Sequence, residues 1–176
     1  MYNRTDHTTE TFFKNIFMLP ASTNALYNLE DDNLIIKSYY QINHKKSSEQ
    51  NIKELLTESI NFRLISDVPV SISLSGGIDS SGIASLIPGI NTNAISAFTL
   101  NPGKNEIGNE IDNVEKLLSM YPKINLIKCN INNKTFSENY KKILWHMDEP
   151  FMGMSPFVRW AISDRVNKNG FKVLLN

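Results

Sequence analysis

From residue 47 onward, short apolar segments alternate with segments whose apolar residues recur every three or four positions. The first pattern is typical of buried strands and the second of amphipathic helices. Strands separated by helices predict a parallel sheet with helices on both faces, because parallel neighbours need a crossover connection. We therefore expect an open, Rossmann-like α/β fold. The expected strands are residues 70–74, 94–100, 124–129 and 171–175.

Helix boundaries are predicted from capping and breaking residues. Ser47 with Gln50, and Thr135 with Glu138, have the spacing of a capping box, which marks a helix start. Pro88-Gly89 predicts the end of the short helix that opens at residues 79–81. Pro156 in a first turn and Gly170 after a last turn are expected to bound the final helix. Together with apolar periodicity, these signals place helices at about residues 47–66, 79–87, 107–118, 135–147 and 156–169.

The first 46 residues are less regular. We expect a tail, a turn-like stretch after Pro20 and a strand at residues 34–40, which together form a connector with a β lead-in or small hairpin. Residues 47–176 are expected to form the α/β domain. The chain ends directly after an apolar strand, where ligand-binding loops of open α/β sheets follow. We therefore expect a partial domain, truncated at its C-terminal end.

Composition limits the classes of protein that this sequence can represent. Lys and Arg number 18, as do Asp and Glu, so no excess positive charge attracts nucleic acid or an anionic membrane. No apolar run approaches the roughly 20 residues of a membrane-spanning helix, and the first residues lack the apolar core of a secretory signal. The single cysteine, Cys129, excludes a disulfide framework. We expect a cytoplasmic protein that binds neither nucleic acid nor membrane.

The segment Leu74–Ser81, LSGGIDSS, carries the clearest functional signal. It joins a predicted strand to a predicted helix, where free backbone N–H groups and the helix dipole favour an anion. Gly76 and Gly77 let the backbone approach a ligand closely, and the serines add hydroxyl donors. Asp79 would repel a phosphate unless a cation lay between them, so it is a candidate Mg²⁺ ligand. The Gly-Lys-Ser/Thr sequence of kinase and GTPase loops is absent.

The same segment has a simpler interpretation. The two glycines can form an ordinary strand-to-helix turn, with Asp79 or Ser80 as a helix cap. For two glycines alone that would be the better interpretation. The strand, the serines, the aspartate and the helix together favour a phosphate-binding loop.

The sequence SGGIDS matches the pyrophosphate loop of the ATP pyrophosphatase superfamily, the N-type ATPases. The longer segment at residues 66–86 resembles the synthetase domain of glutamine-hydrolysing asparagine synthetase, and residues 11–42 resemble the connector before that domain. Further resemblance lies in AFTL at residues 97–100, in MDEPF followed by Ser155-Pro156, and in FKVLLN at residues 171–176. The resemblance covers about residues 10–176 and is weakest between residues 101 and 140.

This resemblance implies an adenine nucleotide alpha hydrolase-like fold and an ATP-dependent ligase. Enzymes of this family adenylate the β-carboxylate of aspartate, release pyrophosphate, and form asparagine with ammonia or glutamine-derived nitrogen. The implied cofactors are ATP and Mg²⁺. By position, the implied pyrophosphate ligands are Ser75, Gly76, Gly77, Asp79 and Ser80, with Asp79 and Ser80 catalytic and Asp79 holding the metal, while Leu74, Leu100 and Asn176 contact the nucleotide.

Two departures from the family pattern restrict what the chain is expected to do alone. Tyr2 stands where the family has its glutaminase cysteine, and the chain ends before the family's Gly-rich Asp-Glu loop. We expect the isolated chain to be inactive, to need a separate ammonia source, and to associate with the missing C-terminal part or a second copy. Two alternatives stay open: a related enzyme that closes lactams or cyclises peptides, and a degenerate nucleotide-binding fragment without catalysis.

Other candidates carry weaker signals. Asp148-Glu149 is equally an active-site pair or the exposed end of a helix. Glu110 and Asp112 could help to hold magnesium, although acidic residues in a first turn usually complement the helix dipole. The three histidines lack mutual ligand spacing, and Cys129 is expected to be a core residue rather than a nucleophile. The apolar residues around Asp148-Glu149-Pro150 are expected to pack in the core or against missing parts of the chain; they are Trp145, Met147, Phe151, Met152 and Met154.

Overall fold

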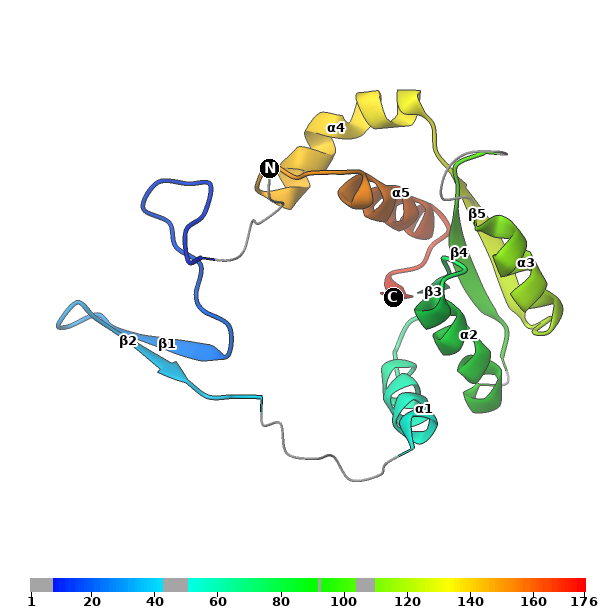
Figure 1. Cartoon of the computed structure of the whole chain (residues 1–176), viewed down its shortest axis with the longest axis horizontal. Coiled ribbons are helices and arrows are strands. Elements are labelled where there is room, and N and C mark those ends of the chain that lie inside the picture. The colour runs from blue at the N-terminus through cyan, green and yellow to red at the C-terminus, as the bar shows by residue number, and fades with distance from the viewer. Residues whose placement is uncertain (1–7, 43–50, 92, 104–109) are drawn as a thin grey trace. The chain divides into compact units, whose positions relative to one another are not determined.

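The computed structural model describes residues 8–42, 51–91, 93–103 and 110–176 (Figure 1). By its internal contacts the chain divides into two compact units, residues 1–48 and 49–176. The first unit holds a two-stranded sheet, and the second holds a four-stranded sheet with helices.

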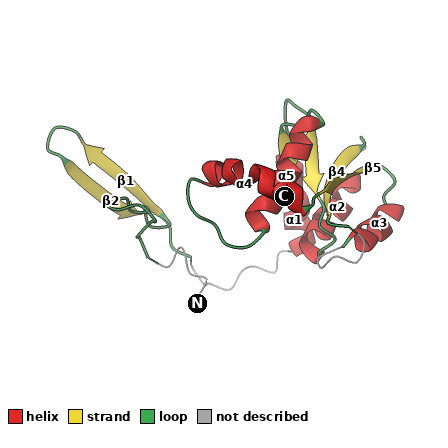
Figure 2. Ribbon diagram, turned by 90° about the horizontal axis from the view of Figure 1, so that it is seen from above, coloured by secondary structure: helices red, strands yellow, loops and turns green. Residues whose placement is uncertain are grey.

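The N-terminal unit contains an antiparallel hairpin of β1 (Thr23–Asn28) and β2 (Asn33–Ser38), which pair over their full length (Figure 2). Asn28 begins the connecting turn, because its side-chain oxygen accepts a hydrogen bond from the backbone N–H of Glu30 at 3.0 Å. The expected later strand is confirmed as β2. The turn-like stretch predicted after Pro20 is wrong from residue 23 onward, since those residues form β1.

The sheet of the second unit consists of β3 (Val70–Ser73), β4 (Ile95–Asn101), β5 (Ile124–Asn130) and β6 (Val173–Leu175). All neighbours are parallel, in the order β5-β4-β3-β6, which confirms the expected open parallel sheet. Strand β3 is therefore central. The chain passes from β3 to β4 and β5 on one side and returns to β6 on the other side of β3.

Helices cover both faces of this sheet. Successive strand residues point to opposite faces, and apolar side chains on each face are buried under helices. On one face, α1 (Ile52–Arg63), α2 (Ile78–Ile90) and α3 (Ile111–Ser119) contribute to a core that includes Ala97 of β4. On the other face, α5 (Ser155–Lys168) packs over Phe98, the next residue of β4. Figure 1 shows α3 and α5 on opposite sides of β4 and β5. None of the described helices combines the length and apolar character needed to cross a bilayer.

Two predicted helix boundaries are wrong, each for a local reason. Helix α2 runs through Pro88-Gly89 and ends one residue later. Because Pro88 lies in the last turn, its missing N–H removes one hydrogen bond and leaves the earlier turns intact. Helix α4 (Asn133–Met147) is capped by Asn132, whose side-chain oxygen accepts the backbone N–H of Thr135 at 2.8 Å. Thr135 is thus a first-turn residue and not the cap.

Helix α1 begins at Ile52, and Asn51 caps it by accepting the backbone N–H of Lys53 at 3.0 Å. The capping box predicted at Ser47 and Gln50 lies outside the described residues. The same holds for residue 107, the first apolar position expected in the helix that corresponds to α3. Its described part begins at residue 111.

Both predicted boundaries of α5 are confirmed. Pro156 lies in the first turn, and Gly170 follows the last turn at φ +81°, where it donates its N–H to the carbonyl of Asn167 at 2.9 Å. Helix α4 packs against α5 through an edge-to-face contact between Phe136 and Phe157, whose ring centroids are 5.1 Å apart.

Candidate functional site

The SGGIDS loop lies at the carboxyl end of the central strand. Leu74 follows β3, and α2 begins at Ile78 with Gly77 as its N-cap residue. Because β3 has β4 on one side and β6 on the other, this is the point where the strand order reverses. Open α/β sheets bind ligands in the crevice at such a switch point, beyond the carboxyl ends of the strands. The structure therefore places the loop where the topology favours a ligand site.

Two serine hydroxyl groups hold the loop against the first turn of α2. The Ser80 hydroxyl oxygen accepts the backbone N–H of Ser75 at 3.1 Å and lies 2.9 Å from the Ser75 hydroxyl oxygen. The Ser75 hydroxyl in turn accepts the backbone N–H of Gly77 at 3.3 Å. Ser75 and Ser80, which are five residues apart, are thus brought together, with their hydroxyl groups beside the N-terminus of α2.

The N-terminus of α2 has no side-chain cap. Its N-cap residue is Gly77, which has no side chain, and the Ser75 hydroxyl accepts the N–H of Gly77 itself and not an N–H of the first helical turn. The cap predicted by the simpler interpretation, Asp79 or Ser80, is therefore wrong, while an ordinary strand-to-helix turn stays a possible interpretation of the loop. Because the first N–H groups of a helix have no partner within the helix, an uncapped N-terminus is suited to an anion.

Asp79 lies in the first turn of α2 with its side chain exposed. No hydrogen bond or ion pair joins it to another residue in the part of the chain that the structure describes. A free carboxylate beside a loop that is predicted to bind phosphate has the chemistry of a magnesium ligand, because Mg²⁺ is commonly held by one or two carboxylates together with substrate phosphates. Among the described residues, no group of three or more His, Cys, Asp or Glu side chains forms a metal site. The donor set therefore fits Mg²⁺ bound jointly with a phosphate ligand.

The other predicted nucleotide contacts lie near the same edge of the sheet. Leu74 is 1% exposed and donates its N–H to the carbonyl of Phe98 in β4 at 2.9 Å. Leu100 lies two residues beyond Phe98, near the carboxyl end of β4. Asn176 is exposed directly after β6, whose Leu175 pairs with Ile72 of β3. Leu74, Leu100 and Asn176 thus lie at or just beyond the carboxyl ends of β3, β4 and β6, which share one edge of the sheet because the strands are parallel.

The acidic candidates separate into two kinds. Asp148 ends α4 in the left-handed conformation, at φ 58°, and both Asp148 and Glu149 are exposed, which favours the interpretation as a helix end. Glu110, in contrast, lies beside the loop: a Cβ added to Gly76 would be 3.0 Å from the Glu110 carbonyl oxygen. Sequence reasoning missed this contact, because nothing local links two residues 34 positions apart.

Cys129 is confirmed as a core residue, at 3% exposure on the α5 face of the sheet. Burial raises the pKa of its thiol to about 11, although the positive charge of Arg165 partly opposes this shift. At pH 8 the native thiol is therefore protonated. We expect iodoacetamide to alkylate the native chain at least about a hundredfold more slowly than the urea-unfolded chain, whose thiol has an ordinary pKa near 8.5. Since the sequence holds one cysteine, mass spectrometry reads this site directly. Equal rates at pH 8 would contradict the burial.

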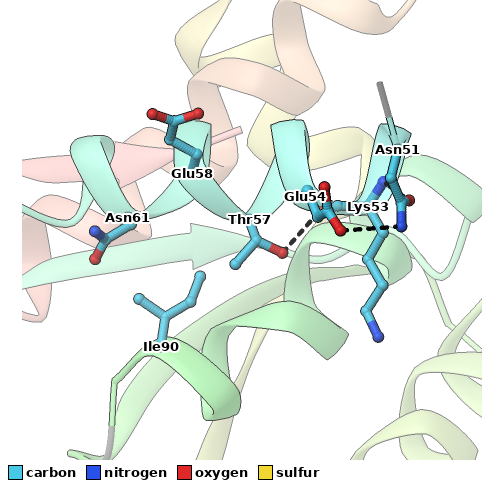
Figure 3. Close-up of a pocket in the computed structure, with 7 residues that line it drawn as sticks. All are labelled: Asn51, Lys53, Glu54, Thr57, Glu58, Asn61 and Ile90. Carbon is cyan, nitrogen blue, oxygen red and sulfur yellow. Dashed lines mark hydrogen bonds between the residues drawn. The ribbon is translucent and has the colours of Figure 1, made fainter. Parts of the chain in front are cut away.

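A separate surface pocket of about 670 Å³ lies between α1 and the C-terminal end of α2 (Figure 3). Six of its seven lining residues are polar. Several of them bond to one another at α1: the Thr57 hydroxyl donates to the carbonyl of Lys53 at 2.7 Å, and the Asn51 side-chain amide donates to Glu54 at 3.4 Å. The SGGIDS loop lies at the opposite end of α2, so this pocket is distinct from the loop. The lining residues are Asn51, Lys53, Glu54, Thr57, Glu58, Asn61 and Ile90.

Fold and loop together define an open α/β protein with a glycine- and serine-rich strand-to-helix loop at its switch point. Residues 51–176 match the family model for asparagine synthase, and the chain therefore belongs to the asparagine synthase family. The match includes the whole SGGIDS loop and all four strands of the parallel sheet.

Several individual proteins are similar to this chain. A Methanocaldococcus jannaschii protein named "Putative asparagine synthetase (glutamine-hydrolyzing) 2" is 30% identical over 165 residues, which cover 90% of this chain and 32% of that protein. The amidase chyE of Penicillium rubens is 24% identical over 77% of this chain and 22% of its own length. Among solved structures, the NH3-dependent NAD synthetase of Campylobacter jejuni is similar over 69% of this chain and 53% of its own, with 19% identity and a TM-score of 0.46. The chain thus spans about a third or less of the two curated relatives.

Proposed function

We propose that this chain carries the ATP-binding part of a ligase that activates a carboxylate and converts it to an amide, with aspartate as the acceptor and asparagine as the product. The observation that carries the proposal is the uncapped SGGIDS loop at the switch point, within residues that match the asparagine synthase family. Anion-binding geometry supports a phosphate ligand, and the family membership supports ATP as its source.

The residues divide the work of the first step. The backbone N–H groups of Gly76 and Gly77 and the hydroxyls of Ser75 and Ser80 bind the pyrophosphate portion of ATP. Asp79 holds Mg²⁺, which when bound neutralises the negative charge that builds on the leaving pyrophosphate. The aspartate β-carboxylate attacks the α-phosphorus of ATP. The bond between the α-phosphorus and the oxygen that bridges it to the β-phosphorus breaks, and pyrophosphate leaves. Ammonia then displaces AMP from the acyl-adenylate and loses a proton. The proposed nucleotide contacts outside the loop are Leu74, Leu100 and Asn176.

Selection of aspartate and supply of nitrogen require more of the protein than the nucleotide-binding domain. Residues 47–176 are the nucleotide-binding domain and residues 1–46 a connector. Selection of aspartate and supply of nitrogen, from ammonia or from glutamine, belong to parts represented in the longer relatives. We place the protein in the cytoplasm, where ATP and aspartate are available.

Two measurements test this function. Calorimetry on the 176-residue chain is expected to show ATP binding that is much tighter with Mg²⁺ than without it, because Asp79 and the nucleotide phosphates share the metal. On the full-length protein, exchange of labelled pyrophosphate into ATP is expected to need aspartate, since exchange reports formation of an acyl-adenylate. A folded chain that binds no ATP at millimolar concentration would contradict the proposal at its first step.

A second candidate keeps the adenylation and changes the acceptor. The match to a protein named as an amidase favours this alternative, because it shows the same domain in a relative that is not named as an asparagine synthetase. The exchange assay separates the two candidates: exchange that ignores aspartate and responds to another carboxylate, such as a β-amino acid that can close to a lactam, would favour the second.

A further inference from the structure

The first turn of α3 lies directly behind the SGGIDS loop. A Cβ added to Gly76 would lie 3.0 Å from the carbonyl oxygen of Glu110, 3.1 Å from the Glu110 Cβ and 3.3 Å from Cγ2 of Val114. Distances this short leave no room for a side chain between Gly76 and α3. The neighbouring glycine differs, because a Cβ added to Gly77 would meet only the Ser75 hydroxyl oxygen, at 3.3 Å. The contact with α3 is therefore specific to Gly76.

The atoms that meet Gly76 are themselves held in place. The Glu110 carbonyl accepts the backbone N–H of Val114 at 3.1 Å, which is the first hydrogen bond of α3. The Val114 side chain is 0% exposed and belongs to the same core cluster as Leu74, the residue just before the loop, and Ala97 of β4. The hydrogen bond fixes the Glu110 carbonyl relative to α3, and α3 cannot move away from Gly76 without opening the core around Val114.

Gly76 needs such support. The φ of Gly76 is +81°, an angle that glycine adopts without strain. Glycine adopts negative φ about as readily, so its own preference does not hold this angle. The backbone N–H groups on either side of Gly76 change direction with that angle. Donors that are ordered before the ligand arrives bind it more tightly, because the cost of ordering them has already been met.

We propose that Val114, together with the backbone of Glu110, is a positioning element for the phosphate-binding loop: by packing against Gly76 it fixes the left-handed conformation and so directs the loop N–H groups toward the ligand. This inference rests on the proposed function, because the ligand is the pyrophosphate portion of ATP. Val114 acts through Gly76 and does not contact the ligand itself.

A matched pair of valine variants tests the proposal on the 176-residue chain. Val114→Ala removes the same atoms as Val166→Ala, and Val166 is also buried, at 5% exposure, but on the α5 face of the sheet. We expect Val114→Ala to weaken Mg·ATP binding about tenfold in calorimetry and to speed amide hydrogen exchange at residues 75–77 about tenfold, because the loop opens more often. Val166→Ala is expected to change both quantities by no more than about twofold while lowering the urea midpoint similarly.

The two readouts distinguish failure of the inference from failure of the proposed function. If the parent chain binds no Mg·ATP, the proposed function fails, and hydrogen exchange still decides whether Val114 orders the loop. If the two valine variants affect residues 75–77 equally, Val114 has no positioning role and the inference is overturned.

A reciprocal pair covers the case in which Val114→Ala does not fold. Gly76→Ala is expected to shift the amide NMR signals of Glu110 and Val114, because its Cβ presses on the first turn of α3. Gly77→Ala is expected to leave those signals in place, since its Cβ meets no atom of α3. Equal shifts in the two variants, or none in either, would overturn the inference.

Discussion

Replacing Asp79 by alanine is expected to weaken ATP binding in the presence of Mg²⁺ by at least about a hundredfold and to abolish the difference between Mg²⁺ and EDTA. The side chain is exposed in the first turn of α2, and in the described part of the chain it has no hydrogen-bond or ion-pair partner. Its removal therefore takes little from the fold. The loop N–H groups and the uncapped helix N-terminus are retained, so weak binding that does not depend on the metal should survive. Isothermal titration with ATP, in Mg²⁺ and in EDTA, measures both effects.

Asp67→Ala is the matched control for that experiment. Asp67 is also an exposed aspartate, but it precedes β3, at the opposite end of that strand from the SGGIDS loop. We expect its replacement to leave the dissociation constant for Mg·ATP within about twofold of the parent value, because an exposed charge outside the site contributes little. If Asp79→Ala bound Mg·ATP as tightly as the parent, the metal would not be held by Asp79. An equal loss in both variants would show an effect of general charge instead of coordination.

Replacing Phe98 by alanine is expected to lower the free energy of unfolding by about 3–5 kcal/mol. Phe98 is 0% exposed and forms an edge-to-face contact with Phe171, with ring centroids 5.7 Å apart. It also joins the core on the α5 face that includes Cys129 and Val166. Removing the ring leaves a cavity between the sheet and α5 that the surrounding side chains cannot fill. Urea unfolding followed by circular dichroism measures the loss.

Phe62→Ala serves as the control for Phe98→Ala. Phe62 lies on α1 with 62% of its surface exposed, so its loss is expected to change the free energy of unfolding by no more than about 0.5 kcal/mol. A small effect at Phe98, comparable to that at Phe62, would contradict the packing of α5 against the sheet. A large effect at both positions would show that α1 is covered in solution by another surface.

The parallel sheet was predictable because burial on both faces gives each strand a nearly continuous apolar pattern. Ala97 and Phe98, adjacent in β4, enter the cores on opposite faces of the sheet, and both had to be apolar. Helix ends were predicted less well, because they depend on individual contacts. Either of two nearby polar residues, Asn132 or Thr135, has a side chain suited to cap α4, and the sequence pattern favoured the wrong one. Strand order, including the place of β6 beside β3, is not encoded locally and could not be read from periodicity.

The candidate site divides in the same way. The SGGIDS loop was predictable, because its glycines, serines and aspartate are contiguous and lie between a strand and a helix. The position of Leu100 near the carboxyl edge follows from the parallel arrangement. The contact between Gly76 and Glu110 was not predictable, because it depends on how α3 docks on the sheet. The ligands assigned to these residues stay predictions until binding is measured.

The central place of β3 also sets an order of events during synthesis. Strand β4 begins 25 residues after the first residue of β3. The other neighbour, β6, is much later in the chain: Val173, whose carbonyl accepts the Ser71 hydroxyl at 2.9 Å, lies 102 residues after Ser71. At about 5–20 residues per second, a ribosome needs on the order of 5–20 s to make that interval. During this time the edge of β3 that later pairs with β6 is unpaired. The SGGIDS loop then follows a strand with only one neighbour, and the crevice at the switch point is incomplete. A newly made chain therefore exposes the SGGIDS loop for seconds before β6 pairs with β3, and a chaperone or a nucleotide present in that interval meets a different surface from that of the finished domain.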